Sequence, residues 1–239
     1  TKRSALYLSA ELFQKSGKLF DAADTYQQYI KRYSEPFDLA LEAKVQLVEL
    51  AKARGDVREQ ESWMRELIRT DAKAGSNRSA RSTYLAAQAE TYFAAQELAA
   101  YEAIRLTAPI KKTLKAKRKA MDDVLKRYKT IIDYGVAEFA TEANHRIGEV
   151  YADLYSDLLE SERPKGLDEL TLEQYEIMLE EQAYPFKGKA VDMLAINAER
   201  SWDGFYDKWV KESFKALEEL LPARYGKKET VIEVSQGVH

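Results

Sequence analysis

The stretch Glu142-Ala-Asn-His-Arg-Ile147-Gly148-Glu-Val-Tyr151 decides how this chain folds. Residues three and four apart share one face of a helix, so Tyr151 lies beside both Ile147 and Gly148. The glycine has no side chain and lets a second helix approach closely, while Ile147 and Tyr151 fill the space on either side. We therefore predict a helix here that packs tightly against another helix.

The composition of the whole chain favours helices. Its 239 residues are 45% hydrophobic, which is enough for a substantial core, and they include 10 Gly and 5 Pro. Apolar runs are only a few residues long, so we expect no membrane-spanning segment. The chain begins Thr1-Lys-Arg-Ser, which is typical of an internal stretch of a longer sequence. We therefore expect any targeting segment to lie upstream.

Cysteine content and net charge exclude several classes of site. The chain has no cysteine, which excludes disulfides, thiolate metal sites and cysteine nucleophiles within these residues. The formal net charge of -3 argues against a dedicated nucleic-acid binder. Absence of cysteine does not assign a compartment, because a reduced cytoplasm and a periplasm both permit it.

A second pattern repeats along the chain and indicates helix pairs. Residues 6–13 and residues 85–92 both read Leu-x-x-x-Ala-Glu-x-aromatic. Gly17 follows the first of these stretches at a turn, and Gly55 marks a second turn 38 residues later. We predict helix-pair units at residues 4–36, 37–75, 79–134 and 138–184, a capping pair at 185–226 and a flexible tail at 227–239.

Two of these predictions concern where helices break. The second helix of the third unit is expected to start near Ala95, and it either runs unbroken toward Tyr128 or is broken near Pro109. In the last two units, one helix is expected to end at about Ala183 and the next to run from about Lys187. The aromatic side chains of the capping pair, beginning with Trp202, are expected to close the end of the stack.

Charge is unevenly distributed. Lys and Arg dominate from Arg105 to Lys129, and acidic residues dominate from Glu149 to Ala183. Blocks of this kind can steer a partner, or they can be solvated helix faces that pair with each other. The sequence leaves the role of the basic block open.

Motifs for catalysis are missing. The histidines are His145 and the terminal His239, and there is no glycine-rich phosphate loop, nucleophile elbow or zinc-protease motif. A metal site made from His145, Glu142 and Glu149 is geometrically possible on one helix, but no second ligand cluster supports it. We predict no catalytic residue, no cofactor and no metal site.

The unit pattern resembles tetratricopeptide (TPR) repeats, in which a small residue and an aromatic recur on the first helix. Within that group it is similar to bacterial cell-envelope proteins, through Tyr26-Gln-Gln-Tyr29-Ile30-Lys-Arg-Tyr33 and through Phe139 to Tyr151. The stretches Tyr175-Glu-Ile-Met-Leu-Glu-Glu-Gln-Ala-Tyr-Pro-Phe186 and Arg200-Ser-Trp202-Asp-Gly resemble proteins described as components of a TonB system.

This resemblance implies a right-handed α-solenoid of antiparallel helix pairs in the periplasm or at the outer membrane. It implies a non-catalytic adaptor that binds a peptide or protein segment, in an envelope or TonB-linked complex, and no nucleic acid. The residues it places on the concave face are mostly acidic and would favour a basic segment: Tyr7, Glu11, Glu49, His145, Glu149 and Asp153. The alternatives are a structural periplasmic spacer and an accessory subunit of an envelope enzyme.

Overall fold

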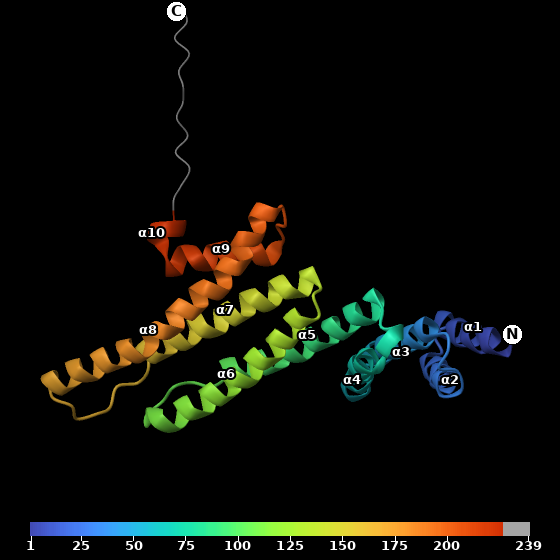
Figure 1. Ribbon diagram of the computed structural model, residues 1–239. Coiled ribbons are helices and arrows are strands. Elements are labelled where there is room, and N and C mark those ends of the chain that lie inside the picture. The colour runs from blue at the N-terminus through green and yellow to red at the C-terminus, as the bar shows by residue number, and fades with distance from the viewer. Residues whose placement is uncertain (227–239) are drawn as a thin grey trace, which may run out of the picture. The chain divides into compact units, whose positions relative to one another are not determined.

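The computed structural model describes residues 1–226, and every regular element in that range is a helix (Figure 1). The predicted all-α class is confirmed. The predicted flexible tail at 227–239 lies outside the described residues. The chain forms two compact units. The N-terminal unit comprises residues 1–96 and 130–139, and the described part of the C-terminal unit comprises residues 97–129 and 140–226.

The N-terminal unit is a series of helices in which α1 packs on α2, α2 on α3 and α3 on α4. Its elements are α1 (Lys2–Lys15), α2 (Leu19–Arg32), α3 (Phe37–Ala53), α4 (Val57–Lys73), the 3-10 helix η1 (Gly75–Asn77) and the first part of α5 (Ala80–Glu102). The turns before α2 and α4 contain Gly17 at φ 76° and Gly55 at φ 70°. These left-handed conformations suit glycine, so the predicted turns are confirmed.

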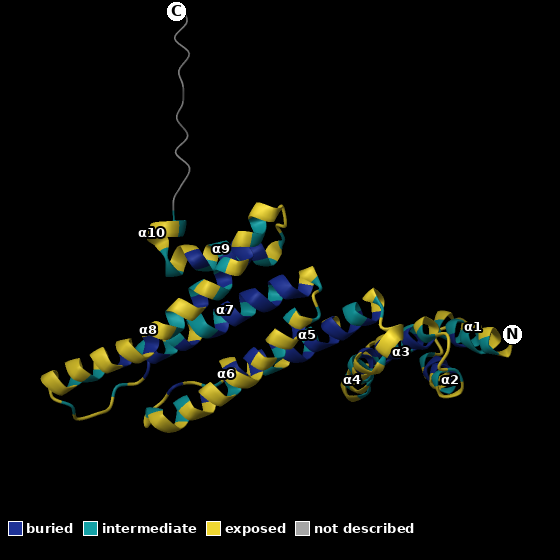
Figure 2. Ribbon diagram, viewed as in Figure 1, coloured by how far each residue is buried: buried dark blue, intermediate teal, exposed yellow. Residues whose placement is uncertain are grey.

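The core of this unit combines small residues with tyrosines. Ala10 and Ala22 are fully buried, and Tyr26 and Tyr29 fill the space beside them. The buried faces appear dark blue in Figure 2, facing neighbouring helices. A larger residue at Ala10 would overpack this contact at a cost of about 1–3 kcal/mol.

The C-terminal unit contains the longest helices. Its elements are the end of α5, most of α6 (Ile110–Asp133), most of α7 (Ala137–Leu159), α8 (Glu169–Arg200), the 3-10 helix η2 (Ser201–Asp203), α9 (Lys208–Leu220) and α10 (Pro222–Tyr225). Helices α8 and α9 pack on each other, and α10 packs on α9.

Gly148 lies where α7 meets α8, and the predicted close approach is confirmed. A Cβ atom built on Gly148 would stand 2.6 Å from Cγ of Leu194. Leu194 is fully buried, and Ile147 beside the glycine is 1% exposed. The glycine therefore allows the backbone of α7 to lie against a leucine of α8.

The predicted helix start near Ala95 is wrong. Helix α5 continues through this residue to Glu102, because the stretch is rich in alanine and buries Leu98 and Tyr101. The chain then breaks before α6, which begins directly after Pro109. Of the two alternatives, the break near Pro109 is the one that the structure contains.

The predicted boundary between residues 184 and 185 is also wrong, because it falls inside α8. Pro185 lies within this helix, although a proline has no N–H to donate to the preceding turn. Buried residues lie on both sides of the proline, with Ala183 before it and Ala190 and Leu194 after it. Continuous packing of one face thus outweighs the local cost of the proline.

Candidate functional site

The N-terminal unit contains an open groove between α2 and α4, with α3 as its floor. Two adjoining cavities of about 620 Å³ and about 520 Å³ form it, and they share Ile30, Lys44, Glu66 and Arg69. Volumes of this size are typical of ligand pockets. We call this feature the α2–α4 groove. Its lining residues beyond those four are Gln27, Lys31, Ser34, Phe37, Ala40, Leu41, Ser62, Trp63, Thr70, Lys73, Ala74 and Asn77.

Helical spacing places these side chains on common faces. Gln27, Ile30 and Lys31 lie three and four residues apart on α2, and residues 62, 63, 66, 69, 70 and 73 follow the same spacing on α4. Phe37 on α3 and Ile30 on α2 are half-buried and supply an apolar surface, whereas Leu41 is 1% exposed and belongs to the core beneath them. The groove therefore has an apolar floor with polar walls.

Positive charge exceeds negative charge in this groove. Lys31, Lys44, Arg69 and Lys73 line it against the single carboxylate of Glu66. Nζ of Lys44 lies 3.2 Å from Oε1 of Glu66, and Nη2 of Arg69 lies 2.9 Å from Oε2. Glu66 is thus shared by two cations. Within residues 1–226, Lys31 and Lys73 form no ion pair and are exposed.

Lys44 is held in place by a second contact. Its Nζ donates a hydrogen bond of 2.6 Å to Oγ1 of Thr70, whose own hydroxyl donates to the carbonyl oxygen of Glu66. The Lys44 side chain is only 16% exposed. Its ammonium group is therefore oriented before any ligand arrives, which lowers the entropic cost of binding an anion.

The residues that the sequence placed on a concave face do not gather in this groove. In the N-terminal unit, Tyr7 is half-buried and packs edge-on against Tyr26 and Tyr29, with ring centres 5.4 and 5.1 Å away. Burial raises the pKa of Tyr7, and the negative charge of Glu11 adds to this effect. Glu49 is exposed and lines a separate cavity of about 270 Å³ formed by α3, α4 and α5.

In the C-terminal unit, His145 is buried, so its predicted position on a partner-facing surface is wrong. It is 3% exposed because α9 packs over it. Nδ1 of His145 lies 3.1 Å from Oγ of Ser213, and Nε2 lies 3.1 Å from Oε1 of Glu149. Ser213 is fully buried and also accepts a hydrogen bond from Asn197. The hydroxyl group of Ser213 is therefore inaccessible to a substrate.

Glu149 and Asp153 follow His145 at intervals of four residues on α7. Burial alone would raise the pKa of Glu149, but hydrogen bonds from His145 and Arg146 hold it below its usual range. Residue Asp153 is exposed, but its carboxyl group lies among other protein atoms and is partly desolvated. This desolvation, together with the negative charges of Glu149 and Glu102, raises the pKa of Asp153 to about 6. Within residues 1–226, no group of three or more His, Asp or Glu residues could hold a metal ion.

A buried network that the sequence did not reveal joins three helices of this unit. Asn197 on α8 donates hydrogen bonds to the carbonyl oxygen of Thr141 on α7, at 2.8 Å, and to Oγ of Ser213 on α9, at 3.0 Å. Oγ1 of Thr141 donates to Asp207, which also caps α9. Each polar group is satisfied, so the network holds α9 on α7 and α8.

The two charged blocks of the sequence meet inside the C-terminal unit. Lys117 of the basic block forms an ion pair with Asp157 of the acidic block and is only 3% exposed. Its Nζ also donates to the carbonyl oxygen of Ile104 at 3.0 Å and lies 4.5 Å from the ring centre of Tyr101. This lysine is therefore a structural residue and no part of a solvated surface.

Comparisons of the chain with protein-family models, with curated proteins and with solved structures found no match. None of the helices in residues 1–226 has both the length and the apolar character that crossing a bilayer requires.

Proposed function

We propose that this chain is a non-catalytic protein-interaction scaffold whose N-terminal unit holds an acidic, partly apolar peptide segment in the α2–α4 groove. The observation that carries the proposal is the excess of cationic side chains around an apolar floor. Ile30 and Phe37, which are half-buried, offer apolar contact. Lys31, Arg69 and Lys73 offer charge-assisted hydrogen bonds to carboxylates.

The proposal reverses the charge preference expected from the sequence. An acidic groove would favour a basic segment, whereas Glu66 is here outnumbered by lysine and arginine. Electrostatic complementarity of this kind mainly speeds encounter and selects partners by charge. We retain the TPR-type pairing as part of the proposal, supported by the buried small residues Ala10, Ala89 and Gly148, each three residues before an aromatic residue.

An envelope location and a TonB-linked partner also belong to this proposal, and their support is the sequence resemblance. The groove itself is independent of location. An acidic segment of any partner protein would find the same cations there, so the charge preference can be tested without knowing the partner.

The experiment measures fluorescence anisotropy of a short labelled peptide made of Glu, Leu and Phe, titrated with the full chain. A matched peptide has Lys in place of Glu. We expect the acidic peptide to bind and the Lys31→Glu/Lys73→Glu double variant to bind it at least tenfold more weakly, because two exposed cations at the groove are reversed.

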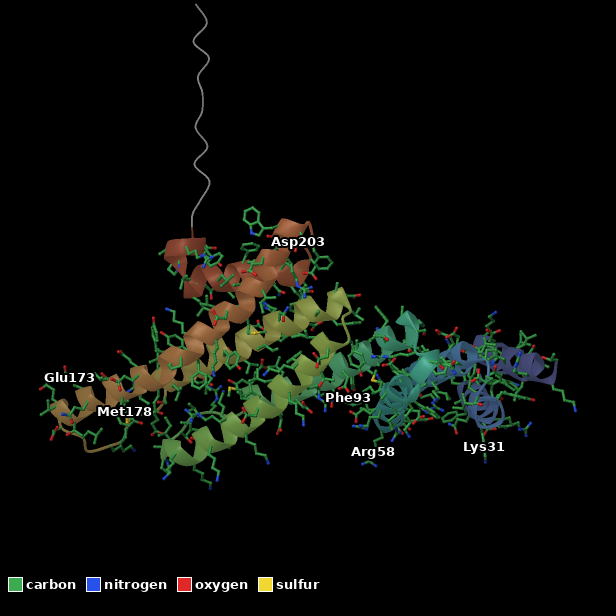
Figure 3. All side chains as sticks on the ribbon, in the orientation of Figure 1. Lys31, Arg58, Phe93, Glu173, Met178 and Asp203 are labelled. Carbon is green, nitrogen blue, oxygen red and sulfur yellow. The ribbon has the colours of Figure 1, made fainter. Side chains whose placement is uncertain are left out.

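A control variant carries the same change in net charge away from the groove. Lys15→Glu/Arg58→Glu reverses two exposed cations that do not line it; Lys31 and Arg58 are labelled in Figure 3. This control should bind like the parent chain. Equal loss in both double variants would indicate a general charge effect, and failure of the acidic peptide to bind would reject the groove.

A further inference from the structure

The N-terminal half of α8 presents a row of apolar side chains to solvent. Leu170 is 65% exposed, Ile177 is 51% exposed and Tyr184 is 72% exposed. These residues are seven apart, which is two helical turns, so they lie on one face. We call this row the α8 stripe. The turns between them carry glutamates and a glutamine on the same side, so the α8 stripe is a row of three large apolar side chains spaced two turns apart among polar ones.

The α8 stripe is distinct from the face that packs in the core. Leu179 and Ala183 are buried, and Leu172 and Tyr175 are half-buried. On a helical wheel these residues point about 120° to 160° away from Ile177. This segment of α8 therefore carries apolar side chains on two sides. Within residues 1–226, only the inner side is covered by other parts of the chain.

Negative charge surrounds the α8 stripe. Ile177 has Glu173, Glu180 and Glu181 among its neighbours three and four positions away, and all three are exposed. From Glu169 to Tyr184 every charged residue is a glutamate. Carboxylates thus border the apolar row from Glu169 to Glu181, although Arg163 pairs with Glu176 and Lys187 lies one turn beyond Tyr184.

We propose that the α8 stripe docks an amphipathic helix of a partner protein, one whose apolar row is flanked by Lys or Arg. Apolar residues at heptad spacing fit the row on α8, and flanking cations meet the glutamates, as at the edge positions of paired helices. A second copy of α8 would bring glutamates against glutamates, and this repulsion disfavours self-pairing. This surface is separate from the α2–α4 groove and has the opposite charge preference.

The test uses a labelled synthetic helix with Leu at each heptad position and Lys or Arg beside it, titrated with the full chain by fluorescence anisotropy. A matched peptide has Gln in place of the cations. We expect the basic peptide to bind, the Gln peptide to bind more weakly, and binding of the basic peptide to weaken as salt is raised.

Ile177→Gln is the decisive variant, and Met178→Gln is its matched control. Met178 is 41% exposed and adjacent in sequence, but it points about 100° away from Ile177. Figure 3 labels Met178 and Glu173 on this part of α8. We expect Ile177→Gln to weaken binding about tenfold, since the exposed half of this side chain would be buried in the complex, while Met178→Gln binds like the parent. Circular dichroism confirms that both variants keep their helix content.

Three results would overturn the proposal. The first is that the basic peptide does not bind. The second is that Ile177→Gln binds it like the parent. The third is that the chain alone dimerises and Ile177→Gln dissociates the dimer, which would make a second copy the occupant. Lys31→Glu/Lys73→Glu should not weaken binding of the basic peptide, so failure of the α2–α4 groove and failure of the α8 stripe are distinguishable.

Discussion

Replacing Gly148 with alanine tests the contact between α7 and α8 directly. The added Cβ would stand 2.6 Å from Cγ and 2.7 Å from Cδ2 of Leu194, about 1 Å closer than carbon atoms normally approach. Leu194 is fully buried, so it has little room to move away. Overpacking of this kind costs about 1–3 kcal/mol, and alanine recovers about 1 kcal/mol of helix propensity. We expect Gly148→Ala to lower the free energy of unfolding by up to about 2 kcal/mol.

Urea unfolding followed by circular dichroism measures this effect, and Gly188→Ala is the matched control. Gly188 also lies within α8, but a Cβ there would meet no atom within 4 Å. Only helix propensity then changes, and we expect stability to rise by about 0.5–1 kcal/mol. If both glycine variants shift the urea midpoint upward by the same amount, the reasoning about close approach at Gly148 is refuted.

A double-mutant cycle sharpens the result. Leu194→Ala alone removes buried atoms and should cost about 2–5 kcal/mol. In that background Gly148→Ala no longer meets the leucine side chain, so its own cost should disappear. A coupling of about 1 kcal/mol or more between the two positions supports direct contact. Additive effects would show that the two residues do not touch.

Three further predictions concern charged and polar groups. The pKa of Asp153 is raised from 3.8 to about 6, so the folded state holds the proton more tightly and stability should fall as pH rises between about 4 and 6. Asp153→Asn should flatten this part of the profile and raise stability at pH 7 by at most about 1 kcal/mol after screening, as urea midpoints across pH will show. Asp71 is 2% exposed and accepts hydrogen bonds from Arg78 and Ser82. Asp71→Ala should therefore lower the free energy of unfolding by about 3 kcal/mol. A decrease below about 1 kcal/mol in thermal or urea unfolding would contradict this structural role. Asn197→Ala leaves the buried hydrogen-bond partners of Asn197 unsatisfied. It should lower the free energy of unfolding by about 2–4 kcal/mol and speed amide hydrogen exchange in α9. Unchanged exchange in α9 would argue against the network.

Local sequence patterns predicted the helices well, because helix formation depends on neighbours three and four residues away. The small residue at Ala10 and the turn at Gly17 could be assigned from such neighbours, and both are confirmed. Pro185 shows where this reasoning fails. A proline predicts a helix end from local chemistry, but packing of Ala183 and Ala190 on either side keeps α8 continuous.

Exposure of the capping aromatics was also not predictable from spacing. Trp202 was expected to help close the end of the stack, yet it is 90% exposed. It lies in η2, after α8 has ended at Arg200, and so it leaves the helical face on which the spacing argument depended. Because α8 ends two residues before Trp202, this aromatic side chain does not share the buried face of the helix.

The α2–α4 groove could not be predicted from the sequence, because its residues come together only in the tertiary structure. Lys31, Lys44 and Arg69 belong to three helices, and nothing in their local sequence shows that they share a groove. A run of positive residues would have been a visible signal, but these cations are spread along the chain. The α8 stripe differs, because its seven-residue spacing is present in the sequence and only its exposure had to come from the structure.

Local residue patterns were enough to predict that this chain is helical, that α7 carries a position where another helix comes close, and that charge is divided into blocks. Which polar faces are covered depends on how the helices pack. His145 is buried because α9 packs over it, and Ser213 of α9 lies 68 residues away in sequence. Lys117 is buried where it forms an ion pair with Asp157 on another helix. Helix formation is set by neighbours within a few residues, whereas the exposure of a side chain depends on distant segments that the fold brings together.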